Sequence, residues 1–461
     1  MAVLLMWVLA WLPRSARTRQ LVFLVASYTL YALWSPVFLA ILVLSTLANY
    51  GFGVLLRRGP SAIRLWIGIA FNIALLGTFK YLPAVAASWA PHSEVAAKLS
   101  SIVLPIGISF WTFEALSYLL DVYRGEDLDP SLLEFCLYLA FWPTVLSGPI
   151  CRLPNLLPQL RQDFAPSKDA LRNGVNRILI GLFMTAVAQT LAAGIKSGQG
   201  VDAAFSSTST AWSGTDVWCL AIAYGFQLFL DFAGYSHVVI GAARLFGIRL
   251  EENFNNPYLS TTPSMFWTRW HMSLSSWIRD YLFLPLATAR RELWWRNLAL
   301  AISMVIFGLW HKGSLLFLIW GVYQGVLLML HRQWQQFQRW SGFSWAGYVA
   351  APVSWLVTFA AMSLGWIFFR ANDLHQARTM WAAVVNLGSY GQLALPRSLY
   401  LLTAIVVVGY FCVVGIKWLL EREPQVQFRI PVEFRFAAYA VMFYWAMLHI
   451  AEPQAFIYFQ F

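Results

Sequence analysis

The chain contains, from residue 297 to residue 311, the stretch Asn297-Leu-Ala-Leu-Ala-Ile-Ser-Met-Val-Ile-Phe-Gly-Leu-Trp-His311. A second apolar stretch, residues 315–330, begins four residues later. Two such runs joined by a short turn predict a pair of membrane helices. His311 would then lie between two spans, where an ionisable side chain usually faces a cavity or a partner. Because imidazole titrates near neutrality, His311 is a candidate general acid or base, and a hydrogen-bonded core histidine is the alternative.

The composition predicts an integral membrane protein. Of the 461 residues, 59% are hydrophobic and only 11% are charged, whereas soluble domains carry about 25% charged residues. At roughly 20 residues per span, the chain has room for about ten to twelve helices in one bundle. The short alternating segments of a membrane barrel are not evident. The 24 tryptophans and 19 tyrosines suit belts at the two membrane surfaces.

The net charge of +11 is best explained by membrane topology. Basic residues concentrate in short connections, as expected for cytoplasmic loops. Nucleic-acid binding is disfavoured, because no solvated basic domain exists to carry it. The four cysteines lie far apart, in or beside apolar runs and without a CxxC pair, which favours structural thiols over disulfides.

The apolar runs predict a single domain over residues 1–461 with both termini outside the cytoplasm. Residues 1–13 lack a basic leader and a cleavage site, so they are expected to be a retained span. Simple alternation fails at residues 102–120 and 135–146, one of which must be broken or re-entrant. Residues 244–296 carry too many charges to span and are expected to form interfacial and re-entrant helices on the cytoplasmic side. A cationic loop is expected at residues 332–339. The remaining spans are expected at residues 21–34, 37–56, 65–90, 178–193, 217–230, 298–310, 315–330, 349–368, 401–419 and 436–449.

Residues 266–281 are the second candidate site segment. As one helix, this segment would place His271, Ser275 and Arg279 on one polar face, opposite a mainly aromatic face. An amphipathic helix lying against lipid headgroups is one interpretation. The functional alternative is the lining of a cytoplasmic entry, in which Arg269 and Arg279 meet the phosphates of an anionic donor.

Asp231 is a further candidate, because it follows an apolar run and an acid at that depth needs a partner. Tyr235 could satisfy the carboxylate, and a structural salt bridge is the alternative to direct participation. The asparagine-rich stretch 253–257 is expected to form a turn that positions the following helix. No HxxxH, HExxH or Cys/His cluster occurs, so a metal site is not expected.

Taken in order along the chain, these segments resemble the membrane-bound O-acyltransferase family, and within it the alginate O-acetylation branch. The resemblance rests on Pro105-Ile-Gly-Ile-Ser-Phe-Trp-Thr-Phe-Glu-Ala-Leu-Ser-Tyr-Leu-Leu-Asp-Val-Tyr-Arg-Gly125, Ser147-Gly-Pro149, Asp231-Phe-Ala-Gly-Tyr-Ser236, Glu252-Asn-Phe-Asn-Asn-Pro-Tyr258, Phe266-Trp-Thr-Arg-Trp-His271, Arg279-Asp-Tyr-Leu-Phe-Leu-Pro285, Gly308-Leu-Trp-His311 and Phe456-Ile-Tyr-Phe-Gln-Phe461. Three positions depart from the family pattern: Lys312 replaces a usual glycine, His237 an aspartate and Glu114 a glutamine.

The resemblance implies an all-helical membrane protein with a tunnel through a thinned centre, where a funnel from each side meets at a catalytic histidine. His311 matches that histidine, and His271 matches the second polar position. The family implies no bound cofactor, acetyl-CoA as a cytoplasmic donor, and an extracytoplasmic partner resembling SGNH hydrolases that completes transfer to a glycan. Contacts with the donor or the acceptor are expected from Arg269, Trp270, Ser275, Arg279, Asp280, Trp310, Asp231 and Tyr235.

The sequence therefore predicts an acetyltransferase in the bacterial inner membrane, with the lipid bilayer, acetyl-CoA, a glycan and an SGNH-like protein as its partners. Two alternatives stay open. One is a relative that takes its acyl group from a carrier protein, as in D-alanylation of teichoic acids. The other is a transporter or export scaffold without chemistry of its own, for which internal repeats would be expected.

Overall fold

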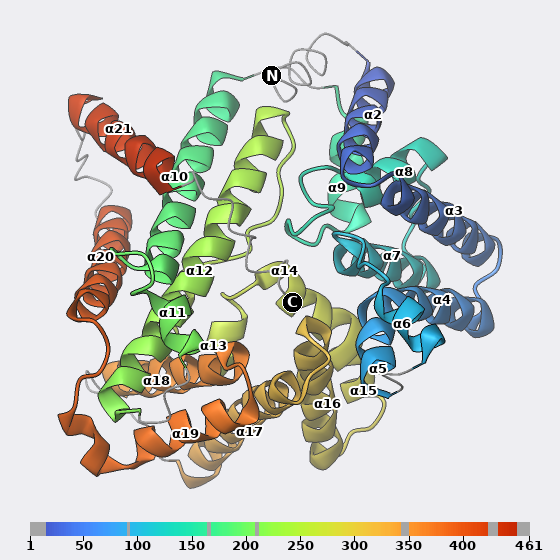
Figure 1. The fold of residues 1–461 in the computed structure, drawn as a ribbon. Coiled ribbons are helices and arrows are strands. Elements are labelled where there is room, and N and C mark those ends of the chain that lie inside the picture. Colours follow the sequence, from blue (N-terminus) through green and yellow to red (C-terminus); the bar gives the residue numbers. More distant parts are fainter. Residues whose placement is uncertain are drawn as a thin grey trace. The chain divides into compact units, whose positions relative to one another are not determined.

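The computed structural model describes residues 15–89, 93–163, 167–207, 212–342, 350–422 and 432–449. These residues form helices joined by turns and loops, and they contain no strand (Figure 1). The expected span at residues 1–13 and the closing motif Phe456–Phe461 lie outside the described residues, as do both ends of the chain. The all-helical fold class is confirmed.

The chain divides into two compact units, each described here by itself. The first unit comprises residues 1–178 and 236–252, and the second comprises residues 179–235 and 253–461. The helices of the first unit are α2 (Ala16–Trp34), α3 (Pro36–Arg58), α4 (Ala62–Lys80), α5 (Leu82–Trp89), α6 (Glu94–Ser100), α7 (Ile108–Tyr123), α8 (Leu132–Ala140) and α9 (Leu153–Arg161), with parts of α10 (Lys168–Ala193) and α12 (Gly214–Leu245).

The second unit contains the rest of α10 and α12 and every later helix. Its short elements are α11 (Val201–Ser206), η1 (Pro257–Leu259), α13 (Pro263–Trp267), α14 (Met272–Trp277), the π-helix η2 (Ile278–Phe283), α15 (Leu284–Thr288) and η3 (Leu387–Gly391). Its longer helices are α16 (Leu293–His311), α17 (Leu315–Ser341), α18 (Ala350–Arg370), α19 (Leu374–Val385), α20 (Arg397–Arg422) and α21 (Val432–His449).

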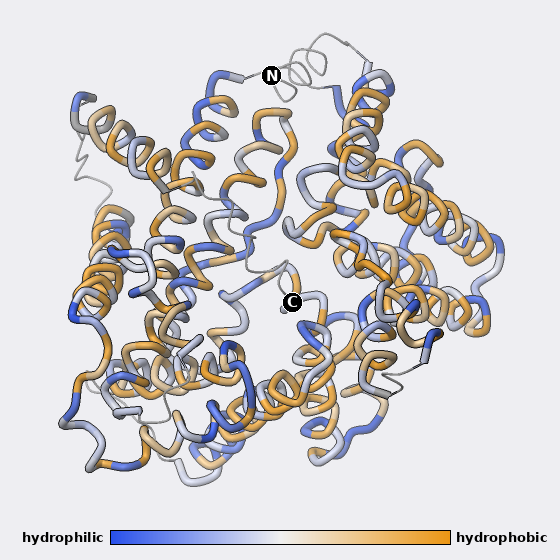
Figure 2. Tube along the Cα trace, viewed as in Figure 1, coloured by the Kyte–Doolittle hydropathy of each residue, from blue (hydrophilic) through white to orange (hydrophobic). Residues whose placement is uncertain are grey.

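Eight helices among the described residues are long and apolar enough to cross a membrane. Figure 2 shows hydrophobic residues along most of the length of α3, α4 and α20, which suits a lipid-facing surface. The chain is therefore a multi-pass membrane protein. The candidate spans are α3, α4, α10, α12, α16, α17, α18 and α20.

The apolar run 135–146 does not form a span. The helix α8 ends at Ala140 after nine residues, and turns follow up to Ser147. Nine helical residues cover only about 14 Å, roughly half the hydrocarbon thickness. The run 102–120 instead yields most of α7, which has 16 residues. Of the two ambiguous runs, 135–146 is thus the more strongly broken one.

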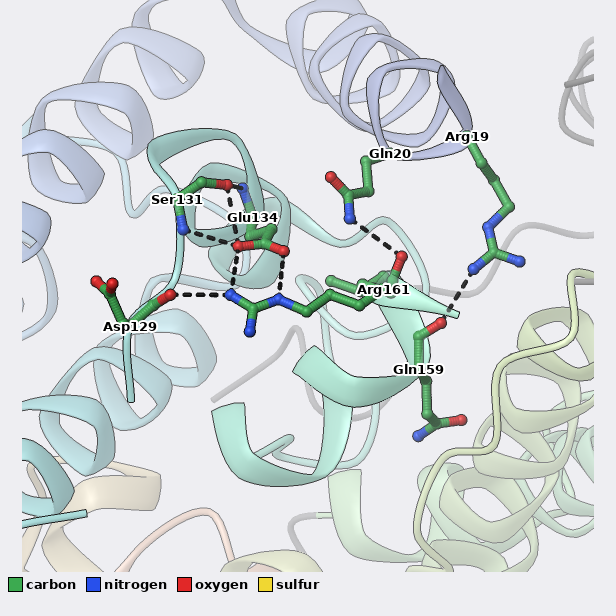
Figure 3. Close-up of polar contacts among 8 residues, drawn as sticks. Arg19, Gln20, Asp129, Ser131, Glu134, Gln159 and Arg161 are labelled. Carbon is green, nitrogen blue, oxygen red and sulfur yellow. Dashed lines mark hydrogen bonds and ion pairs between the residues drawn. The ribbon is translucent and has the colours of Figure 1, made fainter. Parts of the chain in front are cut away.

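Polar contacts hold the start of α8 against α9 in the first unit (Figure 3). Ser131 and Glu134 form a capping box, in which the Ser131 side chain accepts from the Glu134 N–H and the Glu134 carboxylate accepts from the Ser131 N–H. Arg161 of α9 donates from Nε to Glu134 Oε1 at 2.7 Å and from an Nη to Oε2 at 3.0 Å. Gln20 of α2 donates to the Leu160 carbonyl at 3.0 Å, which ties the same region to the first described helix.

The hairpin of α16 and α17 is the scaffold of the second unit. A Cβ atom added at Gly308 would lie 2.3 Å from the Phe317 carbonyl oxygen, and one added at Gly321 would lie 2.5 Å from the Met304 carbonyl oxygen. Only glycine allows the two backbones to approach this closely, as in packed membrane helices with small residues at the interface. Because Gly308 lies three residues before His311, this contact fixes where the histidine stands.

Two expectations about local structure are wrong. The cationic stretch 332–339 is not a loop, because α17 continues as a helix to Ser341 and ends at Gly342 in a left-handed conformation (φ 67°). The run 65–90 is not one helix, since α4 ends at Lys80 and α5 begins at Leu82. Pro83, at the second position of α5, cannot donate the backbone hydrogen bond that a continuous helix would need.

Candidate active site

His311 is the last residue of α16 and is 3% exposed. Its imidazole lies among five aromatic rings, and the distances between ring centroids range from 4.8 to 6.2 Å. The five are Phe307 and Trp310 of α16, Phe317 and Trp320 of α17, and Phe369 of α18. Three helices therefore build a mostly apolar surrounding for one titratable ring, and such a site excludes bulk water.

The segment 266–281 is not one helix, so the expected polar face of His271, Ser275 and Arg279 does not exist as a helical stripe. The helix α13 ends at Trp267, α14 begins at Met272, and a π-helix starts at Ile278. His271 itself has φ 42°, the left-handed region that non-glycine residues rarely adopt. Such a conformation costs of order 1–3 kcal/mol, and it persists only where the surroundings hold it.

The asparagine-rich turn supplies that support. The Met272 N–H donates to the Asn253 carbonyl at 2.9 Å, and the Ser273 hydroxyl donates to Asn253 Oδ1 at 2.6 Å. The Asn255 N–H donates to the Arg269 carbonyl at 3.0 Å. These bonds replace the helical bonds that would otherwise cross the break. The expectation that this turn positions the following helix is therefore matched by hydrogen bonds on both sides of His271.

His271 is fully buried, and its ring packs edge-on against Phe232 of α12 at 4.7 Å between centroids. Burial lowers the pKa of the His271 imidazole to about 3, because the charged form would lose its hydration. A neutral imidazole keeps one N–H that can donate a hydrogen bond. His271 can therefore act as a neutral hydrogen-bond donor at physiological pH.

A cavity of about 520 Å³ lies beside the middle of the α16–α17 hairpin, and we call it the α14 cavity. It contains three basic side chains, Arg279, His331 and Arg332, and its described lining contains no carboxylate. Ser275 also lines it and donates to the Trp270 carbonyl at 2.9 Å. The full lining is Ser264, Trp267, Thr268, Met272, Ser275, Ser276, Ile278, Arg279, Phe283, Leu300, Ser303, Met304, Phe307, Leu328, His331, Arg332 and Gln335.

A second cavity, of about 760 Å³, lies at the turn between α16 and α17, and we call it the α12 cavity. Four of its polar side chains, Tyr224, Gln227, Asp231 and Tyr235, follow one another along a single face of α12. The other lining residues are Thr185, Ala188, Gln189, Ala192, Asp202, Lys312, Ser314, Leu315, Leu316, Phe317, Phe369, Arg370, Ala371, Asn372, Asp373 and Leu374.

His311 itself lines neither cavity, but its ring packs against aromatic residues in the walls of both. Phe307 lines the α14 cavity and lies 5.1 Å from the His311 ring. Phe317 and Phe369 line the α12 cavity and lie 6.2 and 5.2 Å from the same ring. The two cavities are thus separated by the aromatic cluster that contains His311.

The residues expected to contact donor or acceptor are distributed between these places. Ser275 and Arg279 line the α14 cavity, whereas Asp231 and Tyr235 line the α12 cavity. Asp280 pairs with Arg279 at 2.6 Å. Their roles stay predictions. The others belong to the surroundings of the histidines: Trp310 packs on His311, Trp270 stacks on Phe266, and Arg269 accepts the Asn255 bond through its carbonyl.

The sequence interpretation missed part of both linings. His331 fell between the expected span and the expected cationic loop, Arg332 fell in that loop, and only the continuation of α17 brings both to the α14 cavity. Tyr224 and Gln227 could have been found, because their spacing from Asp231 (seven and four residues) places all three on one helical face. Asp202 and Arg370 are distant in sequence, and no local pattern relates them.

An all-helical membrane protein with a buried histidine between two cavities is a candidate membrane acyltransferase, and comparison with known proteins supports this class. The model of the membrane-bound O-acyltransferase family matches residues 21–371. The probable alginate O-acetylase AlgI of Pseudomonas aeruginosa is 35% identical over 398 residues, covering 83% of this chain and 72% of the relative.

Two further relatives carry different activities in their names. The peptidoglycan O-acetyltransferase of Helicobacter pylori is 31% identical over 409 residues, which cover 81% of this chain and 75% of the relative. The teichoic acid D-alanyltransferase of Bacillus subtilis is 28% identical over 287 residues, covering 59% and 69%. The chain belongs to the membrane-bound O-acyltransferase family, and the predicted class of enzyme, an acyltransferase, is confirmed.

Proposed function

We propose that the protein moves an acetyl group from cytoplasmic acetyl-CoA to a hydroxyl group of an extracytoplasmic polysaccharide. The observation that carries the proposal is the position of His311, whose ring touches the walls of both cavities. Donor and acceptor could then approach one imidazole from two sides. The names of the alginate and peptidoglycan relatives support an acetyl group and a glycan.

The basic residues around the hairpin support a cytoplasmic position for the α14 cavity. Arg290, Arg291 and Arg296 precede or begin α16, while Arg332 and Arg339 lie toward the end of α17. These positions gather at one end of the antiparallel pair, and the turn at its other end carries a single lysine, Lys312. By the positive-inside rule the arginine-rich end is cytoplasmic. Acetyl-CoA would enter there, in the inner membrane of a bacterial cell.

Arginine side chains suit the phosphates of this donor. Arg279 and Arg332 line the α14 cavity, and guanidinium groups bind phosphate oxygens through paired hydrogen bonds. Because Arg279 already pairs with Asp280 at 2.6 Å, Arg332 is the main candidate for this contact. The thioester end would then point along α16 toward Phe307 and His311.

The chemistry needs one base and one hydrogen-bond donor. In this proposal His311 takes the proton of the acceptor hydroxyl while its oxygen attacks the thioester carbonyl carbon, a contribution of about 10²–10⁴-fold. The neutral N–H of His271 donates to the developing oxyanion. The carbon–sulfur bond then breaks, and the coenzyme thiolate takes the proton from the His311 imidazolium. The first acceptor hydroxyl would belong to an extracytoplasmic protein of the SGNH type, which then completes the transfer to the polysaccharide.

A D-alanyl group delivered by a carrier protein is the second candidate, because teichoic acid D-alanyltransferases are among the relatives. The two candidates differ in the donor alone. Purified acetyl-CoA suffices in the first case, and a loaded carrier protein is required in the second.

The decisive experiment measures acetyl release from radiolabelled acetyl-CoA in inverted membrane vesicles. It compares the wild type with His311→Ala and His271→Ala at matched protein level. His375→Ala is the control, since His375 is an exposed residue of α19. Loss with His311→Ala alone or with both variants supports the proposal. Equal activity in all four proteins would overturn the role of His311, and turnover only with a loaded carrier would favour the D-alanyl candidate.

A further inference from the structure

The α14 cavity ends at an aromatic wall on the side of His311. Phe307 and Trp267 line the cavity and also pack on rings of the cluster around the histidine. Phe307 is 3% exposed and Trp267 is 9% exposed, so only a small part of each ring meets the cavity. His311 itself does not line the cavity. The cavity therefore stops at these two rings before it reaches the imidazole.

Neighbouring rings hold this wall in place. The centroid of the Phe307 ring lies 5.1 Å from that of Trp267 and 5.5 Å from that of Trp320. Trp267 lies 5.9 Å from Trp320, which is 1% exposed. Because protein interiors are close-packed, rings with such neighbours cannot move aside without displacing them. Phe307 also precedes Gly308, whose close approach to the α17 backbone fixes this turn of α16.

The wall limits the size of a group that approaches the imidazole from this cavity. In the proposed function the thioester carbonyl lies beside His311, whose ring centroid is 5.1 Å from that of Phe307. The acyl carbons beyond the carbonyl would then meet the rings of Phe307 and Trp267. A single methyl group needs the least room there, and each added methylene must be forced into a well-packed wall.

We propose that Phe307 and Trp267 determine the acyl specificity of the enzyme, because they restrict the acyl group of the donor to about the size of acetyl. The inference rests on the proposed function, since it places the acyl group of that donor in the α14 cavity. One methylene too many in an apolar pocket changes specificity by about 10–200-fold. The selectivity of such a wall is therefore large enough to measure.

The test measures binding without acyl transfer. The full-length protein in detergent is titrated calorimetrically with two ketone analogues, S-(2-oxopropyl)-CoA for acetyl-CoA and S-(2-oxopentyl)-CoA for butyryl-CoA. In both analogues a methylene between sulfur and carbonyl prevents thioester cleavage. We expect the wild type to bind the butyryl analogue about tenfold more weakly, or weaker still. Equal affinities, or no saturable binding of either analogue, would overturn the proposal.

Two variants enlarge the space at the wall. Phe307→Leu removes the ring beside His311, and Trp267→Phe replaces the larger indole by a phenyl ring. The preference for the acetyl analogue should fall about tenfold in Phe307→Leu and about threefold in Trp267→Phe, because the added methylenes become buried in the released space. Free CoA is the control ligand, and its affinity should stay at the wild-type value, since it carries no acyl group. A wild-type preference in both variants would overturn the proposal.

Phe317→Leu is the matched control on the other side of the imidazole. The Phe317 ring lies 6.2 Å from that of His311 and lines the α12 cavity instead. This variant should keep the wild-type ratio of the two affinities. A ratio that shifts in Phe317→Leu and not in Phe307→Leu would place the acyl group on the side of the α12 cavity and overturn the assignment.

The two measurements separate the inference from the proposed function. Turnover of acetyl-CoA in vesicles, together with an unchanged affinity ratio in Phe307→Leu and Trp267→Phe, would contradict the size limit alone. A ratio that shifts as expected in a protein that transfers acyl groups only from a loaded carrier would contradict the proposed donor and leave the size limit in place.

Discussion

The α14 cavity and the α12 cavity share one pair of helices and differ in charge. The α14 cavity contains two arginines and a histidine with no carboxylate in its described lining, whereas the α12 cavity contains three carboxylates and two cations. Along α17, Leu315 of the α12 cavity and Arg332 of the α14 cavity are separated by about 25 Å at 1.5 Å per residue. The hairpin therefore connects a basic compartment to a mildly acidic one.

In the proposed scheme, this difference gives the transfer a direction. A polyanionic donor is favoured where the arginines lie and disfavoured where the carboxylates lie. His311 belongs to the aromatic cluster whose members line both cavities, and the proposal therefore places one substrate on each side of it. The variants below change a cavity, the segment around His271 or the packing of the helices that separate the two cavities.

The largest effect is expected from His271→Phe, which keeps an aromatic ring against Phe232 and removes both nitrogens. Losing one donor to an oxyanion lowers kcat by about 10²–10³-fold. The KM for acetyl-CoA should stay unchanged, because the proposal places His271 at the reacting carbonyl rather than on the donor's phosphates. Steady-state kinetics in vesicles measures both constants, and a rise in KM at constant kcat would contradict the assigned role.

The pH dependence of the same variant gives a second readout. Since burial lowers the pKa of His271 to about 3, its imidazole is neutral above pH 5. It takes up a proton only as the pH falls toward 3. Any loss of activity between pH 8 and pH 5 should therefore keep the same midpoint in His271→Phe. A midpoint that disappears with the variant would mean that His271 itself titrates in this window.

Removing positive charge from the α14 cavity is expected to weaken donor binding. Arg332→Gln should raise the KM for acetyl-CoA about tenfold, the loss of one charge-assisted hydrogen bond, with little change in kcat. Arg279→Gln should raise this KM by less, because Asp280 already pairs with Arg279. Arg378→Gln on the exposed face of α19 is the control for net charge. Both cavity variants should also flatten the dependence of KM on salt. An unchanged KM with a lower kcat would place these arginines outside the donor site.

The sequence predicted the elements of this comparison better than their arrangement. Long apolar runs gave α16, α17 and α18 because a span needs a fixed length of apolar residues, a property that is local. His311 could be identified from the sequence because it lies between two such runs. Its aromatic surroundings could not, since Phe369 comes from a helix 58 residues later, and tertiary packing alone brings it to the imidazole.

The broken helix around His271 shows a different limit. Helical periodicity over residues 266–281 was a fair expectation, because no proline or glycine interrupts the segment. The break arises from Asn253, 18 residues earlier, whose carbonyl and side chain take the hydrogen bonds of Met272 and Ser273. Hydrogen bonds from a distant turn therefore override the local preference for a helix. Such departures from the local sequence preference are expected at functional sites.

The partition between the cavities depends on the close approach of α16 and α17. Gly308→Ala should destabilise the protein by about 2 kcal/mol, because the new methyl group would lie 2.3 Å from the Phe317 carbonyl oxygen and push the helices apart. Since His311 is one turn away, kcat should fall severalfold. Gly325→Ala is the control on the same hairpin, where a methyl group would meet its nearest atom at an ordinary 3.6 Å. Thermal unfolding in detergent and kcat together check the pair, and equal behaviour of the two variants would contradict the role of Gly308.

The smallest effect is expected in the first unit, where the Glu134–Arg161 pair lies outside both cavities. The hydrogen bonds from Arg161 lower the pKa of the Glu134 carboxyl below its ordinary value of 4.5, and burial opposes this only in part. A lowered pKa stabilises the folded protein above about pH 4.5, and the gain is lost as the pH falls through the folded value.

Glu134→Gln should therefore lower the unfolding midpoint by about 2 °C at pH 7 and by less as the pH falls below 4.5. Half-exposed Arg161 limits the pair to about 1 kcal/mol. Acetyl transfer at saturating substrates should be unchanged, because neither residue lines a cavity beside His311. A Glu134→Gln variant with wild-type stability and impaired transfer would mean that the first unit contributes directly to the chemistry. The two cavities of the second unit would then not be sufficient for acyl transfer.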